Sequence, residues 1–274
     1  MKKLITMSVL AAMLCCQTIS VASNEPDGQA LPSEEQTVPF VEQALPSEKP
    51  SLFTIPEEGM PVLMYHSIST KYDLSICVSP EEFEQQMKWL YENGYSTVNI
   101  EDFSRALAGE AILPEKPIMI SFDDGYNDNY NVAWPIMEKY GFRATFFIVT
   151  AGVDPFNMDW NQLRDLHEKG NSIGSHTSNH KNLSKLDCGS QEMQLRQSKC
   201  DLENNLGIDI TAFCFPYGMY NNTTLSLLPQ LGYTMSFTIN EGRVHSGDNA
   251  YELKRIHVRG GMPFEQFVEK VSYS

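Results

Sequence analysis

The sequence predicts an α/β domain whose parallel strands close into a barrel. Three observations favour this fold class. From Pro61 onward, short apolar segments alternate with amphipathic ones in seven or so strand–helix units. The strand segments are continuously apolar, as in parallel sheets that are covered on both faces. The repeats fill residues 60–274, a length that suits a closed barrel better than an open doubly wound sheet, which stays the alternative.

The first strand and helix carry the clearest local signals. Residues 61–65, PVLMY, are predicted to form a buried strand. Ser79 is the expected N-cap of the next helix, with Pro80 at its first position and Glu82 completing a capping box. Gly94 is expected to end that helix.

The remaining elements repeat the same alternation. Further strands are predicted at residues 96–100, 117–122, 144–150, 171–175, 211–216, 233–238 and 255–258. Further helices are predicted from Glu101, over 127–140, over 161–170, from Gln191, over 224–231 and from Pro263. Such an order predicts one domain built from consecutive βα units.

The first 22 residues are predicted to form a signal peptide. Two lysines precede an apolar run, residues 4–14, that is too short to span a bilayer. Ser20 and Ala22 supply small residues before a cut after Ala22. Cys15 suggests a lipoprotein anchor instead, but the leucine before it is too large for the usual small-residue position. We therefore expect a protein exported to the periplasm or the exterior, with lipid anchoring the less favoured reading.

Residues 23–59 are predicted to be a flexible acidic linker rich in Pro and Glu. The segment QALPSE occurs twice, and residues 23–58 contain eight acidic residues and one lysine. With few large apolar side chains, this stretch cannot bury enough surface to offset its ordering entropy. The folded domain is therefore predicted over residues 60–274.

The charge excludes some classes of partner. The formal net charge is −15. Nucleic acids and anionic membranes are bound by clustered Lys and Arg, so neither is an expected partner. No integral membrane span is expected, and the oligomeric state is left open with a monomer favoured.

Four cysteines remain after the predicted cleavage: Cys77, Cys188, Cys200 and Cys214. In an oxidising compartment they could form two disulfides in three alternative pairings. They could equally be small buried side chains, Cys214 above all, because it lies in an apolar strand. The sequence leaves both readings open.

Polar residues follow several predicted strands at the point where each strand ends. Asp123 and Asp124 follow strand 117–122, and His176 follows strand 171–175. His66 and Tyr217 occupy equivalent places after the first strand and within FPYG. In a β/α barrel the carboxyl ends of the strands share one rim, where the active site lies. The sequence therefore predicts one site at this rim.

A metal ion would explain the paired aspartates. His176 and His180 are four residues apart, close enough for a single helical turn to aim both imidazoles at one point. Two histidines and a carboxylate form a three-ligand site with an open position, as in catalytic zinc sites. The ion would neutralise one aspartate and leave the other free to act as a base.

These motifs resemble those of the polysaccharide deacetylases, carbohydrate esterase family four. SFDDGY, SHTSNH and FPYG occur in the family's order and spacing, and the resemblance covers the chain from about Pro61 onward. It implies a distorted (β/α)7 barrel, a single domain, and removal of N-acetyl groups from an N-acetylated polysaccharide.

The resemblance also implies a role for each residue of these motifs. Asp123 would be the base, and the Tyr217 backbone N–H would stabilise the oxyanion. One divalent ion would be bound, zinc first and cobalt or nickel as alternatives. Its ligands would be Asp124, His176 and His180.

Two departures from the family pattern matter. Cys214 stands where the family has an arginine, so we expect Arg255 to partner the base instead. PVLMYHSI resembles the leading strand of the permuted poly-N-acetylglucosamine deacetylases. We therefore favour His66 over His257 as the acid.

The same layout favours poly-β-1,6-N-acetylglucosamine as the substrate, ahead of chitin oligomers and peptidoglycan. Two other function classes are weighed against this one. The first is a catalytically impaired carbohydrate-binding protein on the same scaffold. The second is a metal amidohydrolase of a non-polymer substrate, because loops rather than motifs set specificity.

Overall fold

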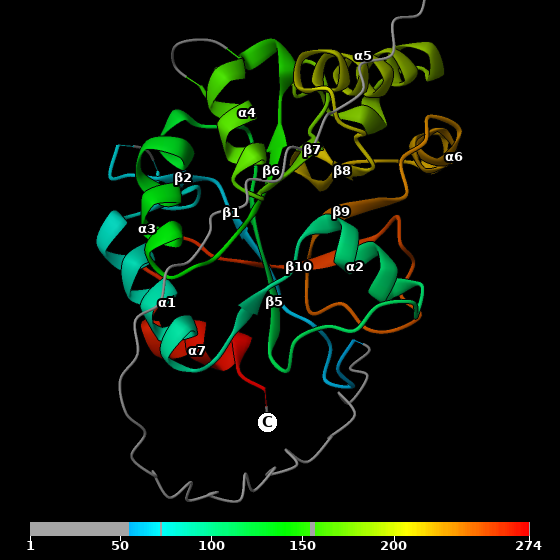
Figure 1. Cartoon of the computed structure of the whole chain (residues 1–274). Coiled ribbons are helices and arrows are strands. Elements are labelled where there is room, and N and C mark those ends of the chain that lie inside the picture. Colours follow the sequence, from blue (N-terminus) through cyan, green and yellow to red (C-terminus); the bar gives the residue numbers. More distant parts are fainter. Residues whose placement is uncertain (1–54, 72, 154–156, 274) are drawn as a thin grey trace, which may run out of the picture. The chain divides into compact units, whose positions relative to one another are not determined.

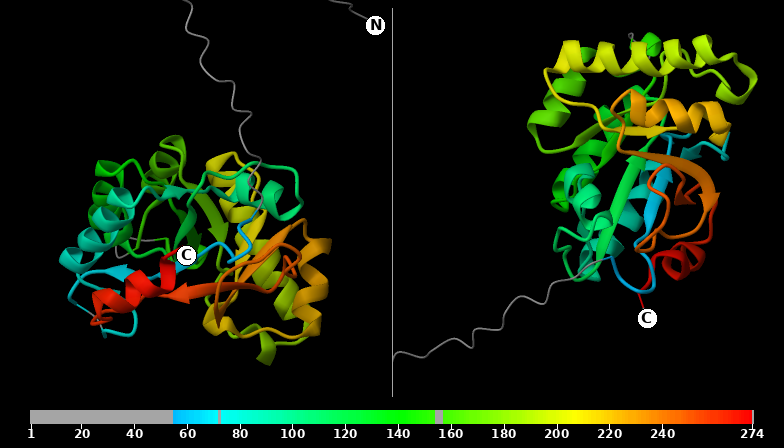
Figure 2. Two further views of the ribbon diagram at one scale, coloured as in Figure 1. Left: turned by 90° about the horizontal axis from the view of Figure 1, so that it is seen from below. Right: turned by 90° about the vertical axis from the view of Figure 1, so that its right-hand side faces the viewer.

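Seven parallel strands follow one another around a closed ring, and this confirms the predicted (β/α)7 barrel. In this computed structural model, residues 55–71, 73–153 and 157–273 are described. The ring consists of β1 (Val62–Tyr65), β5 (Pro117–Phe122), β6 (Thr145–Ile148), β7 (Ser172–Ser175), β8 (Ala212–Cys214), β9 (Met235–Glu241) and β10 (Leu253–His257). Pairing of β1 with both β5 and β10 closes it. The strands lie at the centre of the domain with the helices outside them (Figures 1 and 2).

Among the described residues, three short strands lie outside the ring. β2 (Ser67–Ile68) and β3 (Cys77–Val78) pair with each other just after β1. β4 (Ser96–Thr97) pairs with the first two residues of β5. The segment predicted as a strand over residues 96–100 is therefore a peripheral strand and contributes nothing to the site.

The described chain contains seven α-helices, of which the last follows β10 and the others lie between strands. They are α1 (Pro80–Glu92), α2 (Ile100–Leu107), α3 (Trp134–Lys139), α4 (Trp160–Glu168), α5 (Cys188–Leu206), α6 (Asn222–Gln230) and α7 (Phe264–Val271). Ser79 and Glu82 form the predicted capping box of α1. Helix α5 begins three residues before the predicted Gln191, because the Asp187 side chain accepts a hydrogen bond from the Ser190 backbone N–H and caps it there.

Successive side chains of a strand point to opposite faces of the sheet. This alternation separates two apolar cores, one outside the ring and one inside it. Leu63 of β1 packs outward in the larger core, which also contains Phe83 of α1. The smaller core fills the ring and contains side chains such as Phe147 and Phe237. Phe103 of α2 stacks on Phe237, with the ring centroids 6.0 Å apart. The ring centroids of Phe237 and Phe147 are 5.4 Å apart. These aromatic side chains fill the barrel below the rim, so the site has an apolar floor.

The predicted signal peptide and most of the predicted linker lie outside the described residues. The described residues all belong to one unit of the chain, Lys49–Ser274. Within them, no helix is both long enough and apolar enough to cross a membrane. Cys188 and Cys200 are exposed free thiols, and Cys214 is a buried one. For Cys214 the structure therefore has the buried side chain that its apolar strand suggested.

Candidate active site

The rim residues stand on loops with unusual backbone conformations. Asp124, Thr177, His180 and Tyr217 have φ angles of 74°, 69°, 51° and 59°, and they are the non-glycine residues with positive φ in the described chain. Such left-handed conformations cost free energy in residues with a Cβ and gather at functional sites. All four lie in the loops that follow β5, β7 and β8, so the strain is concentrated at this rim.

Asp124, His176 and His180 converge on one point. Asp124 Oδ1 lies 3.4 Å from His176 Nε2 and 3.2 Å from His180 Nε2. Ligands about 2.0–2.1 Å from a tetrahedral metal ion are about 3.3–3.4 Å apart, so this spacing fits one ion. The predicted helical turn is wrong, because residues 176–180 form a loop in which His180 is left-handed. That conformation, rather than helical spacing, brings the second imidazole to the first.

Hydrogen bonds orient both imidazoles for a cation. His176 Nδ1 lies 2.8 Å from the backbone oxygen of Cys214. A carbonyl only accepts, so Nδ1 carries the hydrogen and Nε2 turns a lone pair towards Asp124. His180 Nδ1 is 3.1 Å from the Tyr217 hydroxyl, which leaves its Nε2 for the same point.

The carboxylate at this point is ionised and has no donor of its own. Asp124 Oδ1 is buried, and no described residue donates a hydrogen bond to it. A carboxylate is ionised at neutral pH, so this oxygen brings a negative charge that needs a positive partner. Two nitrogen lone pairs and a carboxylate facing one point are the donor set of a divalent cation.

Asp123 forms a buried ion pair with Arg255. Arg255 Nη1 donates to Asp123 Oδ1 at 2.8 Å, and Nη2 donates to Oδ2 at 2.7 Å. Arg255 is fully buried and also donates to the Thr238 backbone oxygen and to Ser121 Oγ. Burial raises the pKa of Asp123, but the guanidinium outweighs this and lowers it to about 2. The structure thus places Arg255 against Asp123, the contact expected in place of the arginine missing at position 214.

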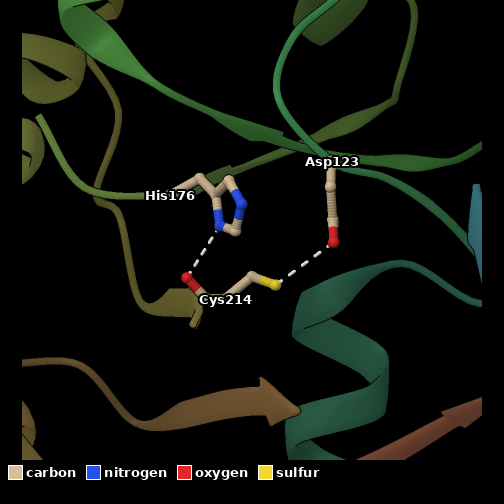
Figure 3. Close-up of side chains that lie close together, drawn as sticks. All are labelled: Asp123, His176 and Cys214. Carbon is tan, nitrogen blue, oxygen red and sulfur yellow. Dashed lines mark hydrogen bonds between the residues drawn. The ribbon is translucent and has the colours of Figure 1, made fainter. Parts of the chain in front are cut away.

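Cys214 lies beside this ion pair. Its Sγ is 3.0 Å from Arg255 Nη2, which donates to it. The thiol itself donates to Asp123 Oδ2, which lies 3.5 Å away (Figure 3). Asp123, His176 and Cys214 also lie close enough together to be considered as metal ligands. Arg255 already occupies both oxygens of Asp123 and brings a positive charge, so a cation does not fit there. The ion site is therefore the one formed by Asp124 and the two histidines.

His66 and His257 differ in the groups that act on their pKa. Burial lowers the pKa of His66, while Asp123 and then Asp124 oppose that effect through their negative charges. Burial also lowers the pKa of His257, but the opposing influences there are the Ser75 backbone and Glu241. The negative charges of the aspartate pair therefore act on His66, whereas the Ser75 backbone and Glu241 act on His257.

Two residues that the sequence analysis did not single out hold the end of β1 in place. Asn129 Nδ2 donates to the His66 backbone oxygen at 2.6 Å. Asp128 accepts hydrogen bonds from Ser67 Oγ at 2.6 Å and from the Ile68 N–H at 2.9 Å. Both residues follow closely after the aspartate pair in the sequence. This run of polar residues is the pattern from which their part in the site could have been predicted.

Comparison with known proteins finds relatives of this chain. A sequence model of the family described as Polysaccharide deacetylase matches residues 111–236. YxkH of Bacillus subtilis (strain 168), whose name places it among the polysaccharide deacetylases, is 34% identical over 246 residues, which cover 85% of this chain and 88% of that protein. The poly-beta-1,6-N-acetyl-D-glucosamine N-deacetylase of Staphylococcus aureus (strain MRSA252) is 27% identical over 222 residues, 76% of each protein.

A solved structure extends the similarity to the fold. The Streptococcus pyogenes deacetylase PplD in complex with acetate superposes with a TM-score of 0.74 and 29% sequence identity. The superposition covers 80% of this chain and 100% of that one. The similarity therefore includes the whole barrel and not only the motifs at its rim.

Proposed function

The chain belongs to the polysaccharide deacetylase family, and from this premise we propose that it is a metal-dependent enzyme that removes N-acetyl groups from a polysaccharide of N-acetylglucosamine. The observation that carries the proposal is the contrast at the rim of the barrel. Asp124, His176 and His180 present a cation site, while Asp123 beside them is committed to Arg255. One carboxylate is thus available to an ion and the other to a proton.

Asp124 and the Nε2 atoms of His176 and His180 would hold one divalent ion. Zinc suits two imidazoles and a carboxylate, and cobalt or nickel are the alternatives. When bound, such an ion polarises the acetyl carbonyl and lowers the pKa of water. His176 is kept in the binding tautomer by its bond to the Cys214 backbone oxygen.

Asp123 would accept the proton of the attacking water. Arg255 keeps its carboxylate ionised and fixes its orientation through two parallel hydrogen bonds. The aromatic side chains below the rim exclude water from the other side of the ion pair. Arg255 Cζ lies 5.8 Å from the centroid of the Phe147 ring. A held carboxylate at this place is what general base catalysis needs.

Tyr217 and His66 would complete the reaction. The Tyr217 backbone N–H is the proposed donor to the oxyanion, and the left-handed conformation of Tyr217 is the strain expected of a residue fixed for that task. His66 would give a proton to the departing amine, which is a poor leaving group without one. Its closeness to Asp123 and Asp124 supports this choice over His257.

The substrate we propose first is poly-β-1,6-N-acetylglucosamine. The leading strand that carries His66 is the layout of the permuted enzymes, and one relative is named for that polymer. Chitin oligomers and peptidoglycan come next. We further propose that the protein is exported, on the strength of the signal-peptide pattern in residues 1–22, and that it acts as a monomer.

The experiment is acetate release from these three polymers by the purified mature protein. Chelator-treated protein should be inactive, and Zn²⁺, Co²⁺ or Ni²⁺ should restore release, most strongly on the β-1,6-linked polymer. Undiminished release after removal of metal would refute metal dependence. Release only from a small acetamide would favour an amidohydrolase of non-polymer substrates, and binding without any release would favour a carbohydrate-binding protein.

A further inference from the structure

Two imidazoles lie side by side where β1 and β10 end. His66 directly follows β1, and His257 is the last residue of β10. These two strands pair to close the barrel. The ring centroids of His66 and His257 are 6.0 Å apart, with the ring planes inclined at 56°. Closure of the barrel therefore brings together two histidines that are distant in the sequence.

Each ring has a buried nitrogen to which no described residue is hydrogen-bonded. These atoms are Nδ1 of His66 and Nε2 of His257. Buried polar atoms in folded proteins almost always have a partner, and an internal water commonly supplies it by joining several such atoms. A centroid separation of 6.0 Å is within the span that one water with two hydrogen bonds can bridge.

The protonation of His66 sets the direction of the hydrogen bonds between the two rings. A histidine that gives a proton to a leaving group first carries hydrogens on both ring nitrogens, so His66 Nδ1 is then a donor. Burial lowers the pKa of His257, and a neutral imidazole has one nitrogen that accepts. The buried Nε2 is then the acceptor, and it can receive a hydrogen that originates at His66 Nδ1.

We propose that His257 is a positioning residue, which holds the His66 imidazole through one bridging water. In this arrangement His66 Nδ1 donates towards His257, and His66 Nε2 is turned to the site. The acceptor also stabilises the protonated form of His66. The inference rests on the proposed function, in which His66 gives a proton to the leaving amine.

The test compares two substrates that differ in their need for an acid. An amine leaves an acetamide only when it is protonated, whereas 4-nitrophenolate leaves 4-nitrophenyl acetate without a proton. The acetamide is the acetylated oligosaccharide that the wild-type holoenzyme hydrolyses fastest. His257→Leu removes the acceptor, and His257→Gln keeps one. His167→Leu, a change at an exposed histidine of α4, is the control.

His257→Leu should lower kcat on the acetamide about tenfold more than on the aryl acetate, as expected for the loss of a hydrogen bond to a charged group. His257→Gln should recover the acetamide rate to within about threefold, and His167→Leu should match the wild type. Equal slowing of both substrates, a glutamine variant as slow as the leucine variant, or no slowing at all would each overturn the proposal.

His66→Ala separates this inference from the proposed function. If His66 is the acid, its removal should slow the acetamide by about 10²-fold or more relative to the aryl acetate. If His66→Ala slows both substrates alike, the acid assignment is wrong and the role of His257 falls with it. If His66→Ala is selective and His257→Leu is not, only the role of His257 is refuted.

Discussion

Asp123 and Asp124 are neighbours in the sequence, yet they belong to two sides of the site that differ in burial, charge and backbone conformation. Asp123 is almost fully buried and shares two hydrogen bonds with a fully buried Arg255. Asp124 is partly exposed, has a left-handed backbone and faces two imidazoles. A single turn of the chain thus gives two chemically identical side chains different tasks, because the surroundings rather than the residue type set the role.

The largest expected effect comes from the buried side. Asp123→Asn keeps the shape of the side chain but removes its ability to take a proton. We expect acetate release to fall by about 10² to 10⁴-fold, the usual contribution of a general base. Initial rates on the best polymer measure this, with the exposed Asp209→Asn as the control. Near-normal turnover would show that the two aspartates have been assigned the wrong way round.

Loss of the Arg255 guanidinium, on the same side of the site, should lower the free energy of unfolding. Arg255→Met leaves the Asp123 carboxylate buried without its partner, a change that typically costs about 3–5 kcal/mol in the free energy of unfolding. Arg259→Met, at an exposed arginine four residues further along, should cost about 0.5 kcal/mol or less. Urea unfolding measures both variants. The double variant Asp123→Asn/Arg255→Met should be more stable than Arg255→Met alone, and the opposite order would argue against a paired charge.

Acid should remove part of the stability that Asp123 provides. Its pKa is about 2 in the folded protein, below the ordinary value near 3.9 for an unfolded chain. Between these values the unfolded chain binds more protons, so the contribution is complete above about pH 5 and is lost as the pH falls towards 2. We expect Asp123 to contribute about 2 kcal/mol to the free energy of unfolding at neutral pH.

The comparison that isolates this contribution uses metal-free protein at pH 7 and pH 3. The free energy of unfolding should fall further in the wild type than in Asp123→Asn, while the titration of Asp124 is common to both. An equal fall in the two proteins would mean that Asp123 does not titrate as the ion pair requires.

The smallest effect is expected at Cys214. Its thiol contacts both partners of the ion pair but has no proposed part in the reaction. Cys214→Ser keeps a small polar side chain that can make the same two contacts. The free energy of unfolding should change by about 1 kcal/mol or less, and acetate release should stay within about threefold of the wild type. A loss of activity as large as that of Asp123→Asn would give the thiol a direct part in the chemistry.

The barrel could be predicted from the sequence because its signals are local. Apolar runs mark the strands, and caps such as Ser79 with Glu82 mark where the helices begin. The prediction of strand ends also placed His66, the aspartate pair, His176 and the Tyr217 turn on one rim. The resemblance to the deacetylase motifs then supplied their roles, which stay predictions until the variants are measured.

The finer geometry could not be predicted because it depends on non-local contacts and on backbone conformation. His180 reaches the ion site through a left-handed φ, which residue type alone does not indicate. Arg255 and Asp123 meet across 132 residues of sequence, and His66 and His257 meet only because β10 closes on β1. The contact of the Cys214 thiol with Arg255 joins β8 to β10 across β9, so it depends on the order of the strands in the sheet.

The most direct test of the split between the two aspartates is the metal content of two variants that differ by one position. Asp123→Asn and Asp124→Asn are purified in parallel, loaded with Zn²⁺, desalted and analysed for bound metal. We predict about one equivalent of metal per chain in Asp123→Asn, as in the wild type, and loss of most of it in Asp124→Asn, because only the second carboxylate faces the imidazoles. Retention of a full equivalent by Asp124→Asn, or loss of metal from Asp123→Asn alone, would contradict the account.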